Sequence, residues 1–317
     1  MSTVFLGTTW FAAAILESLA EHPQHRPKLV ITRPDRPRGR GRRLASPPVA
    51  ESARKLGIEL EQPASVNEQA MVDRIVALAP EAIIVCAFGA LIKEPLLSAG
   101  EMLNVHPSLL PRWRGAAPVE RAIMAGDAST GVSIMRLTAG LDSGPVCLEA
   151  QAPIEAQDDY GRLATRLQEL GGKLLLQALE GIAQGNPLAF TEQPEAGVTY
   201  AEKIEAADRL LDPARPAAEL ERVVRALHPH IGARVALADG TLLGVQRASL
   251  APERASSEGD GVAPATGGAG PGVFEREGRL LLSCAEGALE LLIVQPPGGR
   301  PMPAGDFLRG RGLPAAS

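Results

Sequence analysis

The sequence predicts an α/β fold: a doubly wound, largely parallel sheet domain followed by a small β-barrel. Three observations lead to this prediction. Short apolar runs alternate with helical patterns over the first half of the chain, residues 81–87 (EAIIVCA) form a nearly unbroken apolar run, and short strand patterns dominate after residue 232. A continuous apolar run of strand length is typical of a strand that is covered on both faces. Alternating strands and helices then indicate a parallel sheet.

The first domain is expected at residues 1–184. Its strands are predicted at 3–6, 28–32, 81–87, 102–106, 131–137 and 144–154. Its helices are predicted near 10–20, 46–56, 67–78 and 117–125, and a last helix carries Leu163, Leu167, Leu170 and Leu174 at helical spacing. This order predicts a Rossmann-like sheet, whose ligands bind at the carboxyl ends of the strands where the strand order reverses.

A linker and a smaller domain are expected after it. Residues 185–207 are rich in proline and weakly periodic, as in a segment that connects two domains. The second domain, 208–317, is predicted to contain one helix near 217–227 and short strands at 233–238, 242–250, 279–284 and 288–294. These strands predict a partly antiparallel, OB-like barrel. Residues 251–272 cannot supply a core, and we expect a mobile loop there.

The composition excludes several classes of protein. Hydrophobic residues make up 45% and charged residues 22% of the 317, as in ordinary globular proteins. Cys86, Cys147 and Cys284 are far apart and indicate neither a disulfide framework nor a zinc site, so we expect a reducing cytoplasm and no metal. No apolar run approaches the ~20 residues that cross a bilayer, which predicts no membrane partner. Nothing demands an oligomer, so a monomer is expected.

Charge is distributed unevenly along the chain. The net charge of -5 argues against a protein that coats nucleic acid through its total charge. Residues 33–43 (RPDRPRGRGRR) nevertheless hold six arginines against one aspartate. Composition alone favours a solvated, disordered basic segment. The alternative is a loop whose arginines grip phosphates and stack on unpaired bases.

Two polar side chains share one face of the strand predicted at 102–106. Because side chains alternate along a strand, Asn104 and His106 project to the same side, at positions that a buried parallel strand normally fills with Val or Ile. A hydrogen-bonded Asn and a core His are the plain interpretation. The functional one is favoured because the pair stands at a strand end that two prolines stiffen. An Asn donor beside a His suits the oxyanion that develops at a carbonyl.

A carboxylate is expected to complete this pair. Asp142 lies in the Gly-rich stretch GLDSG (140–144) and could orient or charge His106, although an Asp in such a turn is more often only a turn former. No nucleophile accompanies these residues, because Cys86 lies in an apolar run and no Ser occupies a G-x-S-x-G elbow. The attacking group therefore belongs to the substrate. A nicotinamide or flavin site is disfavoured, since no G-x-G-x-x-G follows the first strand.

Residues 104–144 resemble the catalytic segment of the formyltransferases that use 10-formyltetrahydrofolate, whose pattern is N-x-H-x-S-L-L-P followed by a distal Asp. The resemblance implies that Asn104, His106 and Asp142 are the catalytic residues. It also implies a binding site for the folate co-substrate. The residues of that site would be Ser108, Leu109, Leu110 and Pro111, together with Phe88, Gly89 and Leu91 of the stretch AFGALI (87–92).

Within this superfamily the chain is most similar to the branch that acts on initiator methionyl-tRNA. The stretch 33–49 resembles the loop that this branch inserts into the acceptor stem, and 198–204 and 295–312 resemble its interdomain segment and its C-terminal ending. The resemblance implies tRNA contacts by Arg36, Arg38, Arg40, Arg42 and Arg43. Two features depart from the family: Thr9 replaces a common Pro, and residues 206–317 carry no net positive charge.

The implied reaction moves a formyl group from the folate to the α-amine of methionine esterified to initiator tRNA. Three alternatives remain open. A formyltransferase for an amino sugar nucleotide, glycinamide ribonucleotide or another small amine would keep the three residues but would not need the basic loop or the barrel. A hydrolase domain would pass the group to water. A tRNA-binding or structural module with a degenerate site is the third, and the intact Asn, His and Asp speak against it.

Overall fold

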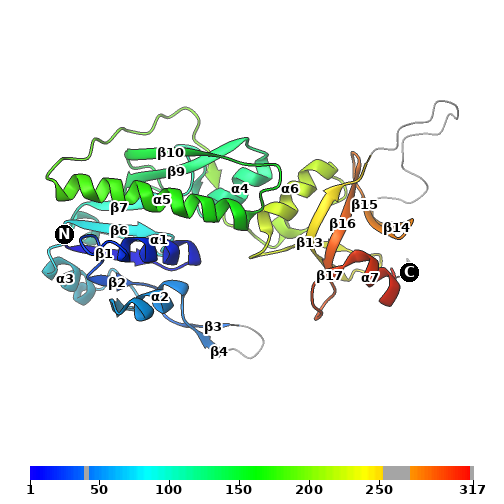
Figure 1. Cartoon of the computed structure of the whole chain (residues 1–317), viewed down its shortest axis with the longest axis horizontal. Helices are drawn as coiled ribbons and strands as arrows, with labels where there is room; N and C mark the ends of the chain where they lie inside the picture. Colours follow the sequence, from blue (N-terminus) through cyan, green and yellow to red (C-terminus); the bar gives the residue numbers. More distant parts are fainter. Residues whose placement is uncertain (39–42, 253–271, 315–317) are drawn as a thin grey trace. The chain divides into compact units, whose positions relative to one another are not determined.

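A computed structural model of the chain describes residues 1–38, 43–252 and 272–314 (Figure 1). Arg40, Arg42 and nearly all of the loop expected at 251–272 lie outside the described residues. The chain forms two compact units. Unit 1 consists of Met1–Pro118, Ser129–Pro153 and Ala164–Glu202, and unit 2 consists of Val119–Ala128, Ile154–Leu163 and Lys203–Ser317.

A seven-stranded sheet forms the centre of unit 1, in the order β10-β9-β7-β6-β1-β2-β5. Five strands run parallel: β1 (Thr3–Gly7), β2 (Leu29–Ile31), β5 (Glu59–Glu61), β6 (Ala82–Cys86) and β7 (Met102–His106). β9 (Ser129–Arg136) runs antiparallel to β7, and β10 (Val146–Pro153) runs antiparallel to β9. The strand order reverses between β1 and β6. The expected doubly wound, largely parallel sheet is confirmed, with a switch point at this reversal.

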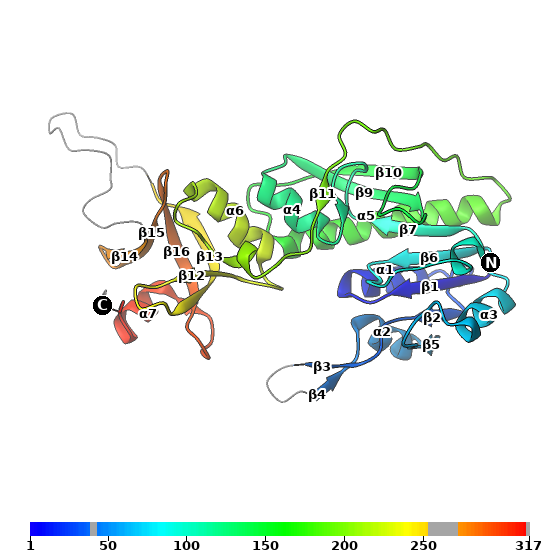
Figure 2. The same ribbon diagram turned by 180° about the vertical axis from the view of Figure 1, so that it is seen from behind.

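Helices cover both faces of this sheet. α1 (Trp10–Ala20) and the long α5 (Tyr160–Ala183) lie on the same face in both views (Figures 1 and 2). A Cβ added to Gly171 of α5 would meet Val105 of β7 at 3.1 Å, so a glycine allows this close approach. α3 (Gln69–Ala77) packs on the other face, where Met102 of β7 joins a core with Val72 and Ile75. α2 (Pro48–Leu56) packs against α1.

Three short strand pairs and two single turns of 3-10 helix occur beside the larger elements of the described chain. β8 (Arg114–Gly115) pairs in parallel with β11 (Tyr200–Ala201), and β3 (Arg36–Arg38) pairs antiparallel with β4 (Arg43–Ala45). In unit 2, β17 (Met302–Pro303) pairs with β16 (Ala288–Gln295). The single turns are Leu96–Ser98 and Ala207–Arg209. Because β8 belongs to unit 1, this pairing of β11 with β8 attaches the expected linker, residues 185–207, to unit 1 near the linker's end.

Unit 2 is built on a curled antiparallel sheet of the expected barrel type. Its strands are β12 (Ala233–Ala236), β13 (Leu242–Leu250), β16 (Ala288–Gln295), β15 (Arg279–Ser283) and β14 (Gly272–Arg276), in that order. Two register irregularities in β13 bend the sheet. α6 (Ala217–Leu227) packs its apolar side on this sheet, and α7 (Ala304–Gly310) adds Ala304 and Phe307 to the same core.

Two segments from the first half of the chain belong to unit 2. In α4 (Pro118–Ala125), Arg121 binds the carboxylate of Asp208 through two bonds of 3.0 Å, and Glu120 lies 2.9 Å from Nε2 of His230. Tyr160 stacks on the ring of His230 with 3.7 Å between the ring centroids. None of the helices in the described part of the chain is long and apolar enough to cross a membrane.

One buried histidine of unit 1 responds to pH. His25 is fully buried, and its Nδ1 atom has no hydrogen-bond partner among the described residues. Burial disfavours the imidazolium and outweighs the attraction of Glu180, so the pKa of His25 lies below its ordinary value of 6.5. Below pH 6.5, His25 therefore binds a proton in the unfolded chain but stays neutral in the folded chain until the pH reaches its lowered pKa.

Acid is expected to destabilise unit 1 through this residue. From pH 6.5 down to the lowered pKa of His25, the free energy of unfolding should fall by up to about 1.4 kcal/mol per pH unit, with no such dependence above pH 6.5. Urea denaturation near neutral pH and at about pH 5.5 measures this loss. The wild type should lose more stability than His25→Leu. Equal losses in wild type and His25→Leu would contradict the prediction.

Candidate active site

Asn104 and His106 lie on one face of β7, as the alternation of side chains predicted. Both are buried, with 7% and 4% of their surface exposed. β7 is hydrogen-bonded to β6 on one side and to β9 on the other. The two side chains therefore stand on a strand inside the sheet, and such a strand holds them more rigidly than a loop would.

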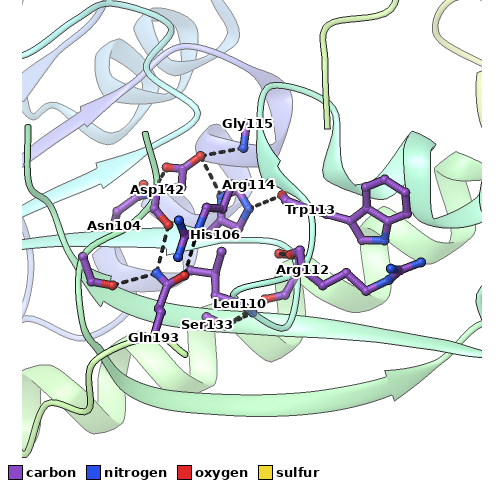
Figure 3. A network of polar contacts seen from close by, with 12 residues as sticks. Asn104, His106, Leu110, Arg112, Trp113, Arg114, Gly115, Ser133, Asp142 and Gln193 are labelled. Carbon is purple, nitrogen blue, oxygen red and sulfur yellow. Dashed lines mark hydrogen bonds and ion pairs between the residues drawn. The ribbon is translucent and has the colours of Figure 1, made fainter. Parts of the chain in front are cut away.

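Asp142 reaches this face by a route that the sequence did not indicate. Because β9 runs antiparallel to β7, its last residue, Arg136, lies toward the start of β7 and away from His106. The loop 137–145 then folds back and brings the Asp142 carboxylate to Asn104 and His106 (Figure 3). Asp142 has a φ of +43°, a left-handed conformation that costs a non-glycine residue roughly 1–3 kcal/mol. The surrounding structure must impose this conformation.

Three contacts hold the Asp142 carboxylate. Its Oδ2 accepts a hydrogen bond of 2.8 Å from the backbone N–H of Gly115 and lies 3.7 Å from Nδ1 of His106. Its Oδ1 accepts a longer bond of 3.4 Å from Nδ2 of Asn104. The side chain is 14% exposed. The structure thus brings together the three residues that the sequence singled out, and it adds a backbone donor.

The two ring nitrogens of His106 have different surroundings. Nε2 lies 2.9 Å from the carbonyl oxygen of Trp113. Since a carbonyl only accepts hydrogen bonds, Nε2 carries a proton. Nδ1 is the nitrogen that faces the Asp142 carboxylate. Trp113 has a φ of +62°, and its N–H donates to Thr199 Oγ1 at 2.9 Å, so the loop that carries this carbonyl is itself fastened.

The first predicted folate stretch, residues 108–111, is a tight loop directly after β7. The Ser108 hydroxyl donates to the carbonyl oxygen of Arg112 at 2.6 Å. Ser133 on β9 accepts a bond of 3.1 Å from the N–H of Leu110 and donates at 2.8 Å to the carbonyl oxygen of Ser108. Both serines therefore shape the loop, and Ser133 is a residue that the sequence did not single out.

The second predicted folate stretch, residues 87–92, follows β6 at the switch point. Three side chains from other segments fasten its carbonyl oxygens. The bonds run from Thr8 to Phe88 (2.7 Å), from Arg33 to Gly89 (2.6 Å) and from Asn67 to Leu91 (2.8 Å). Phe88 is buried, whereas Leu91 is 66% exposed. The loop is held in a preset shape and presents an exposed apolar side chain, and sequence reasoning missed all three anchors.

The described part of the arginine-rich segment is an ordered hairpin stem. Arg36 on β3 and Arg43 on β4 are exposed. At the base of the stem, Asp35 accepts hydrogen bonds from Gln62 at 2.7 Å and from Ser46 at 3.0 Å. These two bonds hold the pKa of Asp35 below its ordinary value. The stem therefore extends from a fixed base on unit 1, and it carries Arg36 and Arg43 as exposed side chains.

Gln193 contacts the loops on both sides of the site. Its Nε2 donates to the carbonyl oxygens of Asp142 (2.9 Å) and Gly144 (2.7 Å), and its Oε1 accepts from Nε of Arg114 (2.9 Å). It lies in the segment expected to be a plain linker, where nothing distinguishes it from the polar residues around it. Only the fold reveals these contacts.

The thiols of Cys147, which is half-buried, and of Cys86, which is buried, do not provide a nucleophile. Burial raises the pKa of Cys147 to about 11 and that of Cys86 far above its ordinary value, so both remain protonated at neutral pH. Among the described residues, no group of three or more His, Cys, Asp and Glu side chains is placed to hold a metal ion. What the chain places at the site is a neutral amide donor, an imidazole and a carboxylate.

Family models account for almost the whole chain. The model described as formyl transferase matches residues 1–179, and that of the formyl transferase C-terminal domain matches residues 203–312. A methionyl-tRNA formyltransferase of Cereibacter sphaeroides is 41% identical over 319 aligned residues, which cover 100% of this chain and 98% of the relative. The chain belongs to the methionyl-tRNA formyltransferase family.

Further relatives of this formyltransferase are similar over the same length. The methionyl-tRNA formyltransferase of Ectopseudomonas mendocina is 41% identical, with 97% of this chain and 94% of the relative covered. That of Paracoccus denitrificans is 39% identical, with 99% of each chain covered. The formyl donor of the family is 10-formyltetrahydrofolate.

Solved structures share the fold of the formyltransferase at low sequence identity. HypX from Aquifex aeolicus in complex with tetrahydrofolic acid has a TM-score of 0.62 and 19% identity, with 97% of this chain and 47% of that chain covered. An N-formyltransferase from Helicobacter canadensis has a TM-score of 0.61 and 15% identity, with 91% and 98% covered. Identities this low establish the common fold alone.

Proposed function

We infer that the chain transfers a formyl group from 10-formyltetrahydrofolate to the α-amino group of methionine on initiator methionyl-tRNA, which yields formylmethionyl-tRNA for translation initiation. The observation that carries this inference is the meeting of Asn104, His106 and Asp142 in a chain that aligns end to end with methionyl-tRNA formyltransferases. Two sugar N-formyltransferases of known structure, at 15% and 16% identity, share only the fold.

The chain's own groups suit attack by the amine of the substrate. An α-amine has a reference pKa near ~7.7 to 8.0, so part of it is neutral at pH 7 and needs positioning more than activation. Asn104 Nδ2 donates to the formyl oxygen as negative charge develops there. His106 adds a second donor, and Asp142 holds that ring. Asp142 also takes part in passing the proton that the attacking nitrogen loses to N10 of the folate, whose bond to the formyl carbon breaks so that tetrahydrofolate leaves.

The two predicted folate stretches fit the formyl donor by their chemistry. The loop 87–92 presents backbone and apolar groups that flank a flat ring, and its anchors Thr8, Arg33 and Asn67 preset its shape. The loop 108–111 adds its leucines and proline beside the end of β7. When bound, 10-formyltetrahydrofolate supplies an activated formyl group on N10. We propose that Phe88, Gly89, Leu91, Ser108, Leu109, Leu110 and Pro111 hold it.

One assay separates the proposed activity from its alternatives. The purified protein is incubated with 10-formyltetrahydrofolate that carries a labelled formyl group, together with charged initiator tRNA, with an amino sugar nucleotide or without an acceptor. Label is expected on the charged tRNA alone. Label on the sugar would indicate a sugar formyltransferase, labelled formate without an acceptor would indicate a hydrolase, and tRNA binding without transfer would indicate a binding module.

We further propose a cytoplasmic monomer, because charged tRNA is used there and the three site residues come from one chain.

The hairpin stem is proposed to contact the acceptor stem of the tRNA. Arg36, Arg38 and Arg43 lie on its described strands, and Arg40 and Arg42 belong to the same proposal. The double variant Arg36→Ala/Arg43→Ala is expected to raise the KM for charged tRNA by about tenfold and to reduce its salt dependence by about one unit of slope per phosphate contact. The KM for the folate should stay unchanged. Steady-state kinetics over a range of salt concentrations measures both effects.

A matched control is available on α3. Arg74 is an exposed arginine of the same unit that pairs with Glu59, and Arg74→Ala should leave both quantities unchanged. If the double variant kept the wild-type KM and salt slope for charged tRNA, the stem would have no part in tRNA binding.

A further inference from the structure

Asp142 occupies a position that the sheet itself does not define. Asn104 and His106 are fixed by the ladders of β7, but Asp142 lies in the middle of the loop 137–145, in a left-handed conformation with a φ of +43°. The loop starts at the far end of β9 and returns across the sheet. A side chain placed in this way needs fastening from outside the loop, because an unsupported left-handed residue would relax.

Gln193 supplies this fastening. Its two N–H groups bind the carbonyl oxygens of Asp142 at 2.9 Å and of Gly144 at 2.7 Å, so they grip the turn on either side of Ser143 (Figure 3). A Cβ added to Gly144 would lie 2.0 Å from the carbonyl oxygen of Arg136, so the turn is also packed closely on its own strand. The two hydrogen bonds from Gln193 and the close packing of Gly144 together restrict the conformation of the turn.

The same side chain also binds the loop after β7. Oε1 of Gln193 accepts from Nε of Arg114 at 2.9 Å. Arg114 lies between Trp113, whose carbonyl oxygen contacts His106, and Gly115, whose N–H binds the Asp142 carboxylate. The three bonds also fix the orientation of the amide, since two carbonyls require its NH₂ group and a guanidinium requires its oxygen.

The backbone of Gln193 is placed independently of these bonds. Thr191, two residues earlier, forms a pair of backbone hydrogen bonds of 2.9 Å with Val146 at the start of β10. Thr199, six residues later, accepts from the N–H of Trp113 and from that of Arg114, both at 2.9 Å. The segment is therefore anchored on both sides of Gln193.

We propose that Gln193 is a positioning residue of the formyl transfer: it sets the Asp142 carboxylate against His106 and Asn104 by bridging the loops 107–115 and 137–145. Gln193 itself touches neither substrate. The proposal rests on the proposed function, because its effect is on the rate of formyl transfer. Since an error of about 1 Å in the placement of a catalytic group can cost about 10²-fold in rate, the loss of one bridging side chain has a measurable kinetic effect.

Substitutions at Gln193 test the role of the amide. Gln193→Met keeps the length and bulk of the side chain but removes its donors and its acceptor, and it should lower kcat by about tenfold to 100-fold with both KM values within about threefold of the wild type. Gln193→Glu keeps an acceptor for Arg114 but sets a carboxylate against two carbonyl oxygens, so it should lower kcat at least as far. Gln151→Ala, at an exposed glutamine of β10 bonded to Ser129, is the matched control and should remain at the wild-type rate.

A double-mutant cycle with Asp142 separates positioning from a general effect on folding. If Gln193 acts through Asp142, then adding Gln193→Met to Asp142→Ala should lower the single-turnover rate by less than about twofold. Losses that multiply in the double variant would overturn the proposal, as would a Gln193→Met enzyme with wild-type kcat. Circular dichroism and thermal melting check that each variant is folded. An inactive wild type would overturn the proposed function as well, whereas an active wild type with an unaffected Gln193→Met variant would overturn this inference alone.

Discussion

Asn104→Ala is expected to lower kcat for the formylation of charged initiator tRNA by about 10²- to 10³-fold, with the KM of the tRNA nearly unchanged. In the proposed mechanism, Asn104 supplies a neutral donor from a rigid strand to the oxygen on which charge develops, and that contact strengthens only in the transition state. Asn104 is 7% exposed, so water does not readily replace the lost amide. Single-turnover rates with enzyme in excess measure the chemical step directly.

The control for this variant is an asparagine outside the site. Asn186→Ala removes an exposed amide whose hydrogen bond is with Gln184, and it should keep the wild-type rate. A rate within tenfold of the wild type for Asn104→Ala would show that the amide is not an oxyanion donor. A loss that appeared mainly in the KM of the tRNA would instead assign Asn104 to substrate binding.

Asp142→Ala is expected to lower kcat by at least about 10²-fold for a different reason. The carboxylate holds three groups at once: the N–H of Gly115, the amide of Asn104 and the ring of His106. Its removal leaves the His106 ring and the Asn104 amide without the group that faces them, and it frees the backbone N–H of Gly115. Rapid-quench measurement of product formation tests the loss.

Asp142→Asn distinguishes the charge of this residue from its shape. The amide keeps the size of the side chain, but its NH₂ group replaces one of the two carboxylate oxygens. An NH₂ group cannot accept, so either the bond from Gly115 or the bond from Asn104 is lost. It should therefore be nearly as slow as Asp142→Ala. Asp73→Ala, at an exposed aspartate of α3 bonded to Gln69, is the control and should keep the wild-type rate. Near-normal turnover in Asp142→Asn would mean that the negative charge is dispensable.

The sheet and the position of the site could be predicted from the sequence because both depend on local patterns. The apolar run 81–87 identified β6, and the polar pair Asn104 and His106 identified a strand with a functional face. β5 was missed, because Glu59–Glu61 is only three residues long and has no apolar run. β14 was missed because Gly272–Arg276 has only two apolar side chains, Val273 and Phe274, and no alternating pattern.

The supports of the site could not be predicted because they join residues that are far apart in the sequence. Gln193 binds Asp142 across 51 positions and Arg114 across 79, and Thr8 binds Phe88 across 80. Each is an ordinary polar residue whose neighbours in the sequence give no sign of a partner. The direction of β9 is likewise set by pairing with β7, so the return of the loop 137–145 across the sheet follows from topology and not from local propensity.

The grip of Gln193 on both loops has a consequence for the order in which a nascent chain acquires its activity. All seven strands of the central sheet have been synthesised by Pro153, yet Gln193 and Thr199 emerge from the ribosome only some forty residues later, a delay of a few seconds at ~5–20 residues per second. The catalytic geometry therefore matures after the core has collapsed. A fragment that ends at residue 179, where the first family match ends, would contain the sheet but not Gln193, which bridges the two loops.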